Sequence, residues 1–78
     1  MYADIHTFTE VATHAHAAGW SYEKYSRYTR ILTVTKEGKH VSVRFGATGN
    51  VARITSDGLT WKPSLETAKN VLAGEMNL

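Results

Sequence analysis

The chain contains no cysteine, a single proline and no long hydrophobic run. Without cysteine there are no disulfide bonds and no thiolate chemistry, a composition that fits a reducing compartment. No apolar stretch approaches the roughly 18 residues of a membrane-spanning helix. The first residues lack the basic segment followed by an apolar segment that marks a signal peptide. These absences predict a cytoplasmic protein that does not act in a membrane.

Catalytic motifs are also missing. With no cysteine, and no serine in a Gly-x-Ser-x-Gly turn, the sequence offers no nucleophile for a catalytic triad. The seven acidic residues are scattered over predicted caps and turns, so no pair of carboxylates is placed for acid–base chemistry. A hairpin explains the glycines of residues 46–49 better than a phosphate-binding loop does. We therefore expect neither an enzyme nor a cofactor.

The 78 residues predict one domain with a small hydrophobic core. In residues 29–54, apolar and polar side chains alternate in three runs separated by two glycine-containing turns. Alternation with a period of two is typical of strands that have one buried face. This central segment therefore predicts a three-stranded antiparallel meander, around which the rest of the chain is organised.

The first turn sets the register of the first hairpin. A two-residue loop at Glu37-Gly38 is favoured because glycine readily adopts the positive φ that such loops need. A slip by one residue would mix the apolar and polar faces, so the register is well specified. The predicted pairs are Val34–Val41, Leu32–Val43, Thr33–Ser42, Thr35–His40 and Ile31–Arg44.

The second turn leaves two registers open. A loop at residues 48–49 pairs Val43 with Ile54, whereas a loop at residues 49–50 pairs Phe45 with Ile54. Both alternatives keep the same face of the sheet apolar. The sequence therefore predicts the faces of this hairpin but not its register.

A third hairpin signal at Asp57-Gly58 adds a short fourth strand, residues 59–61. The predicted apolar face comprises Leu32, Val34, Val41, Val43, Phe45, Ala52, Ile54, Leu59 and Trp61. The predicted polar face comprises Thr33, Thr35, His40, Ser42, Arg44, Arg53 and Thr55. Arg44 and Arg53 are expected nearly opposite each other, where like charges cost a few tenths to about 1 kcal/mol.

Two helices complete the predicted fold. Residues 4–18 have apolar side chains at spacings of three and four, with Asp4 as N-cap and Gly19 as the stop. Residues 64–75 repeat this pattern after the N-cap Ser64. We therefore predict an α+β domain of order α-β-β-β(-β)-α, an antiparallel meander with both helices on one face.

The first helix carries a weak metal-binding pattern. His6, Glu10 and His14 are spaced by four residues, so they share one helix face. Two histidines and a carboxylate at this spacing can bind a divalent metal. A solvated polar face explains the same pattern, because these residues lie away from the apolar stripe and no pocket is indicated. We expect no metal.

Basic charge and aromatic residues gather in the middle of the chain. Residues 21–56 carry seven lysines and arginines against two glutamates. Trp20–Arg30 interleaves aromatic and cationic side chains, a composition found in protein-binding hot spots, in surfaces that stack on bases, and in aromatic residues that seal a small core. The candidate partner-binding residues are Tyr22, Lys24, Tyr25, Arg27, Tyr28, Arg30, Arg44 and Arg53. The candidates for nucleic-acid binding are Lys24, Arg27, Arg44, Arg53 and Lys69.

The order helix, three strands, helix with a basic middle resembles the double-stranded-RNA-binding domain. Ser64, Ala68 and Lys69 match that family's Ser-Lys-Lys-x-Ala-Lys motif, whose lysines hold phosphates, whereas residues 65–66 are Leu and Glu in place of two lysines. His40 corresponds to the histidine of the family's Gly-Pro-x-His loop, without its proline. The resemblance therefore implies RNA contacts for Lys69 and His40 alone.

Residues 41–58, VSVRFGATGNVARITSDG, followed by SLETAKNVLAG at residues 64–74, resemble small orphan proteins of actinobacterial phages. Such proteins often have a short meander that ends in a short helix. The resemblance implies a small intracellular protein that is made during infection and is often directed at a host component. It assigns no functional residues.

The sequence as a whole predicts a non-enzymatic binding protein. Its partner is expected to be a protein, a host protein if the chain is phage-encoded, or a second copy of the chain. Self-association would use the edges of the predicted sheet, residues 28–36 and 59–61. The alternative is a nucleic-acid-binding module that uses the basic polar face.

Overall fold

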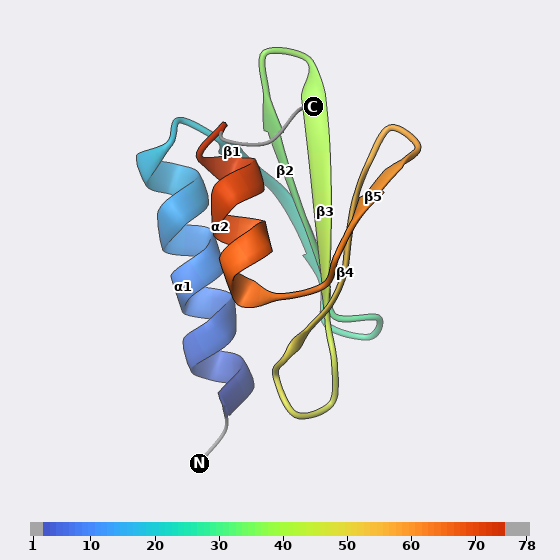
Figure 1. Ribbon diagram of the computed structural model, residues 1–78. Helices are drawn as coiled ribbons and strands as arrows, with labels where there is room; N and C mark the ends of the chain where they lie inside the picture. Colours follow the sequence, from blue (N-terminus) through green and yellow to red (C-terminus); the bar gives the residue numbers. More distant parts are fainter. Residues whose placement is uncertain (1–2, 75–78) are drawn as a thin grey trace.

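The computed structural model of the protein describes the backbone of residues 3–74 and the side chains of residues 8–74. Helix α1 (Ala3–Ala17) precedes five strands, and helix α2 (Leu65–Leu72) follows them. The strands are β1 (Ser21–Ser26), β2 (Ile31–Lys36), β3 (Lys39–Phe45), β4 (Val51–Ser56) and β5 (Leu59–Trp61). They form one antiparallel sheet in the order of the sequence, and both helices lie on the same face of it (Figure 1). The predicted α+β meander with both helices on one face is confirmed.

The β2–β3 hairpin has the predicted register, with all five predicted pairs present. Glu37 and Gly38 have φ angles of 52° and 82°. Asp57 and Gly58, between β4 and β5, have φ angles of 46° and 87°. Two successive residues with positive φ are what type I′ turns require, and the twist of these turns matches that of the strands.

The β3–β4 hairpin resolves the register that was left open. Val43 lies opposite Ile54, and a β-bulge then places Val51 opposite Phe45. Ala52 is the extra residue of the bulge and is exposed, whereas Val51 is buried. The prediction that Ala52 belongs to the apolar face is therefore wrong, because a bulge reverses the side on which the residues beyond it lie.

The apolar face also loses a member at the edge of the sheet. Leu59 is 45% exposed, although Trp61 of the same strand packs partly buried against the core. Strand β5 has only three residues and lies at the sheet edge, so the start of this strand has few neighbours to cover it. The prediction of a short final strand is confirmed, but Leu59 is not a core residue.

Strand β1 is the main departure from the prediction. It pairs with β2, so β2 is an internal strand and the predicted edge at residues 28–36 is wrong. A bulge between Tyr22 and Lys24 interrupts the pairing with β2. Because the bulge breaks the two-residue period, this segment shows no clean strand pattern in the sequence.

Helix α1 ends at Ala17, and Gly19, the predicted stop signal, follows with a φ of 93°. The Gly19 amide donates to the carbonyl of His16 (3.1 Å), and the Trp20 amide donates to the carbonyl of Ala15 (2.9 Å). These are the paired hydrogen bonds of a Schellman motif. Trp20 and Ala15 are both buried, so the motif directs the chain, and the indole, back into the core.

The N-cap predicted for α2 is confirmed, whereas the N-cap predicted for α1 is wrong. Ser64 is the N-cap of α2, and its hydroxyl accepts a hydrogen bond of 3.0 Å from the amide of Thr67. The helix ends at Leu72, earlier than predicted. Helix α1 begins at Ala3, so Asp4 lies inside its first turn and not at the predicted N-cap position. No helix in the described part of the chain is long and apolar enough to cross a membrane.

Trp20 lies where three secondary-structure elements meet at one end of the core. Its indole N–H donates a 2.8 Å hydrogen bond to the Leu72 carbonyl, one of the carbonyls that the end of a helix leaves without a partner. Lys36 at the end of β2 donates to the Ala18 carbonyl (2.6 Å), and its Nζ lies 6.0 Å from the indole ring. Trp20 therefore connects the ends of α1, α2 and β2.

We expect Trp20→Phe to lower the free energy of unfolding by about 2 kcal/mol, because it leaves a buried carbonyl without its donor and removes ring volume from the core. Urea unfolding followed by far-UV circular dichroism measures this change. Tyr28→Phe alters a residue that is 95% exposed, so this control should change stability by less than about 0.5 kcal/mol. Equal effects of the two substitutions would contradict the role of Trp20.

Candidate functional site

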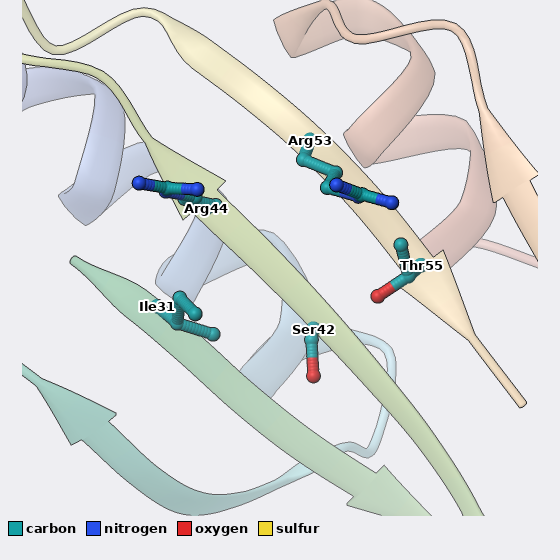
Figure 2. A pocket seen from close by; sticks show the side chains of 5 residues that line it. All are labelled: Ile31, Ser42, Arg44, Arg53 and Thr55. Atoms are coloured by element: carbon teal, nitrogen blue, oxygen red, sulfur yellow. The ribbon is translucent and has the colours of Figure 1, made fainter. Parts of the chain in front are cut away.

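The face of the sheet opposite the helices carries the polar side chains that the sequence assigned to it. Five side chains from β2, β3 and β4 stand together on this open face (Figure 2). They line an open pocket of about 400 Å³. The lining residues are Ile31, Ser42, Arg44, Arg53 and Thr55.

Two arginines face each other across the pocket. Arg44 of β3 and Arg53 of β4 are directly paired, in one of the two registers that the sequence left open, and both are exposed. Among the residues whose side chains are described, the ion pairs involve neither arginine. Like charges directly opposite each other on antiparallel strands are destabilising. The pocket therefore carries positive charge that the described part of the protein does not neutralise.

The pocket is amphipathic. Ile31 is half-buried and lies opposite Arg44, so an aliphatic surface adjoins a guanidinium group. Ser42 lies opposite Thr55, and the Ser42 hydroxyl is 3.2 Å from the hydroxyl of Thr33. Sequence reasoning did not select Ile31 as a site residue, although its pairing with Arg44 was predicted. An aliphatic residue within a polar face was the signal that could have identified it.

Toward the opposite end of the open face, a histidine of β3 contacts a glutamate of β1. His40 Nδ1 lies 3.1 Å from Glu23 Oε1, a contact that joins β3 to β1 across β2. Thr33 on the intervening strand is buried although it lies on the open face. Glu23 therefore places an acidic group on this face, at a distance along the strands from Arg44 and Arg53. His40, which the RNA-binding resemblance selected, is engaged in this contact.

The turn between β1 and β2 lies at the end of the sheet where β3, the strand that carries Arg44, ends (Figure 1). The Arg30 carbonyl accepts a 2.9 Å hydrogen bond from the Phe45 amide, which places Arg30 beside the end of β3. Arg30 has a φ of 60°, in the left-handed region that non-glycine residues rarely adopt. Arg27 is exposed in the same turn, and Tyr28 is 95% exposed. Four arginines, two in the turn and two on the sheet, therefore gather at this end of the molecule.

The remaining candidates of the aromatic segment do not share one surface. Tyr25 is partly buried, and its ring centroid is 4.7 Å from that of Phe8 in a tilted contact. Tyr22 pairs with Val34 on the side of the sheet that the helices cover, although it is 60% exposed. Lys24 is exposed and pairs with a residue of the open face. Of these three, only Lys24 lies on the same face as the pocket.

Lys69 lies on the other side of the molecule. It belongs to α2, where its Nζ is 2.6 Å from Glu10 Oε2 of α1. The sheet separates it from Arg44 and Arg53, because α2 covers the opposite face. The residues predicted for nucleic-acid binding are therefore not on one continuous surface.

The predicted metal pattern on α1 is only partly described. Glu10 takes part in the ion pair with Lys69, and His14 is exposed. The side chain of His6 lies outside the described side chains. Within residues 8–74, no group of three potential metal ligands comes together.

Comparison with known proteins gives no match to a protein-family model, to a curated protein or to a solved structure. The geometry and charge of the open face therefore provide the basis for assigning a function.

We expect Arg30→Gly to raise the free energy of unfolding by about 0.5 to 1 kcal/mol, because glycine adopts this backbone conformation without a steric penalty. Urea unfolding measures the change. Arg27→Gly removes the same charge from the same turn at a position without positive φ, so it should leave stability unchanged or lower it. Equal gains from both substitutions would assign the effect to charge instead of backbone geometry.

We also expect the repulsion between Arg44 and Arg53 to be measurable. Arg44→Thr and Arg53→Thr should each change the free energy of unfolding. When the two are combined, the gain in the free energy of unfolding should be smaller than the sum of the two single changes by a few tenths to about 1 kcal/mol, because either change alone removes the repulsion. The shortfall should shrink at high salt. The pair Arg27→Thr and Arg53→Thr, which are not paired across strands, is the control and should be additive. Additivity of the Arg44–Arg53 pair at low salt would show that the two charges do not interact.

Proposed function

We propose that this chain is a non-enzymatic binding protein that contacts a protein partner through the open face of its sheet. The observation that carries the proposal is the Arg44–Arg53 pair, two opposed like charges that form no ion pair with the described acidic side chains. Such a pair costs stability in the isolated protein. An anionic group supplied by a partner offsets that cost, so binding and charge neutralisation occur together.

The chemistry of the pocket supports binding over catalysis. Arginine stays protonated at physiological pH and does not act as a general base. The hydroxyls of Ser42 and Thr55 line the pocket without a histidine or carboxylate among the lining residues. His40, which lies on the same strand as Ser42, contacts Glu23. The pocket therefore offers groups that hold an anion but none that activates a nucleophile.

The edges of the sheet are poorly suited to pairing with another strand. Strand β1 has a bulge between Tyr22 and Lys24, and β5 has three residues with Pro63 soon after it. Bulges, short strands and prolines all hinder edge-to-edge pairing. These features favour the open face as the contact surface, whether the partner is a different protein or a second copy of the chain.

The likeness to small phage proteins extends the proposal. If the chain is phage-encoded, its site of action is the host cytoplasm and its partner a host protein. The uneven charge of the open face suits binding to a host protein, because complementary charge on the partner orients the two proteins in a small interface.

Nucleic-acid binding is the second candidate. It is favoured by the four arginines at one end of the sheet together with exposed Tyr28, since arginine holds phosphates and aromatic rings stack on bases. The ion pair between Lys69 and Glu10, on the far side of the sheet, argues against the double-stranded-RNA-binding mode. Binding to single strands through the arginine-rich end remains the form of this candidate that the structure suits.

A pull-down with the tagged protein from nuclease-treated and untreated bacterial lysate tests the two candidates. We expect a protein band that survives nuclease and is lost from the variant Arg44→Glu/Arg53→Glu, because charge reversal replaces attraction with repulsion. The control variant Lys39→Glu/Lys62→Glu changes the net charge equally at exposed positions outside the pocket and should retain the band.

Three results would decide against the protein-binding proposal. A band that disappears with nuclease would move the assignment to nucleic acid, as would an affinity that falls steeply with salt. Retention of the band by the Arg44→Glu/Arg53→Glu variant would show that the open face is not the contact surface.

A further inference from the structure

We infer that the pocket over Ile31 accepts one acidic side chain from an extended segment of the partner protein, with its carboxylate held between Arg44 and Arg53. This inference rests on the proposed function and specifies the chemistry of the partner. It identifies the occupant of the open face as an acidic polypeptide segment.

The placement of the two arginines suits a single carboxylate. Residues directly opposite each other on antiparallel strands have Cβ atoms about 4.5–5.5 Å apart, so the Arg44 and Arg53 guanidinium groups can converge on one anion. A guanidinium donates paired hydrogen bonds to a carboxylate, whose two oxygens provide about four acceptor sites. One carboxylate can therefore bind both arginines and remove their mutual repulsion.

The apolar part of the pocket favours a side chain over a free anion. Ile31 is half-buried beside Arg44 and offers a contact for the methylene groups of Glu or Asp. Excluding water from this surface also lowers the local dielectric constant and strengthens the contact between guanidinium and carboxylate. The volume of about 400 Å³ exceeds the needs of one carboxylate and leaves room for the adjoining backbone.

The flanking hydroxyls suit an extended segment. Ser42 and Thr55 lie opposite each other on β3 and β4, beside the arginine pair in the same pocket. A hydroxyl donates and accepts hydrogen bonds, so both residues can bond to the N–H and C=O groups of a backbone that crosses the pocket. The main chain of the partner protein thereby forms hydrogen bonds with Ser42 and Thr55, while its acidic side chain lies between the arginines.

A polyanion fits this face less well than a single acidic side chain. Glu23 lies on the same face and contacts His40, so a nucleic-acid strand that continued along β3 would meet a carboxylate. No aromatic residue lines the pocket, and nucleic-acid affinity depends on several phosphate contacts and on base stacking. The two cations of the pocket provide a local anion site instead of a charged track.

Nuclear magnetic resonance titration of the isotope-labelled full chain tests this inference. The probe is a short capped peptide of alternating Glu and Thr, and its control has Gln at every Glu position. We expect the Glu peptide to shift the amide resonances of the five pocket residues and the guanidinium resonances of Arg44 and Arg53. The Gln peptide should leave them in place.

Variants assign the shifts to the arginine pair. Arg44→Gln and Arg53→Gln should each weaken binding of the Glu peptide about tenfold or more, because each removes a charge-assisted contact. Arg44→Lys keeps the charge but loses the paired geometry, so it should weaken binding by a smaller factor. Lys62→Gln removes a charge outside the pocket and should change the affinity less than about twofold. The dispersion of the amide spectrum verifies that each variant is folded.

The outcomes separate this inference from the proposed function. If the Glu peptide leaves the pocket resonances in place while Arg44→Glu/Arg53→Glu still abolishes partner capture, the inference is wrong and the proposed function stands. If a single-stranded oligothymidylate shifts these resonances and the Glu peptide does not, the occupant is a phosphate backbone and both are wrong. Equal affinities of wild type, Arg44→Gln and Arg53→Gln for the Glu peptide would also overturn the inference.

Discussion

The positive φ angles at Glu37 and Gly38 let β2 turn directly into β3, and the rest of the structure depends on the register that follows. Because side chains alternate sides along a strand, this register sends Leu32, Val34 and their partners toward the helices. The same alternation sends Ile31 and Arg44 to the opposite face. A slip of one residue would place arginine in the core and the apolar residues in solvent. The same β2–β3 register therefore decides which residues form the core and which form the candidate site.

The domain uses its two faces differently. The helices, the buried side of the sheet and Trp20 form the single core on which a chain of this size depends for stability. The open face carries hydroxyls and charged groups, and at one end of it these charges are unbalanced. This face is not needed for the core, and its Arg44 and Arg53 form no ion pair among the described side chains.

We expect two features at the arginine-rich end to lower the stability of the isolated protein. Arg44 and Arg53 repel each other, and Arg30 adopts a conformation that glycine would adopt at lower cost. Local strain of this kind persists when the surrounding structure compensates for it, and it tends to gather at functional sites. The two features arise from different physics, electrostatic and steric. Their occurrence at the same end of the sheet supports the proposal of a binding surface there.

The sequence by itself determined the structure wherever short-range rules apply. Turn residues with positive φ specified the β2–β3 register, and the alternation of side chains placed Arg44 and Arg53 on the same face of the sheet. Their direct pairing was decided by the β3–β4 register, which the sequence left open. Only the tertiary structure decided that Ser21–Ser26 is a strand, because its bulge hides the two-residue period until β2 lies beside it. A second bulge likewise exchanged Ala52 for Val51 in the core. Packing of distant elements also placed Tyr25 against Phe8, joined Trp20 to Leu72 and moved Lys69 to the face opposite the arginines. Local backbone preferences and side-chain periodicity act within a few residues, whereas these contacts join segments far apart in the sequence and form only when the helices pack on the sheet.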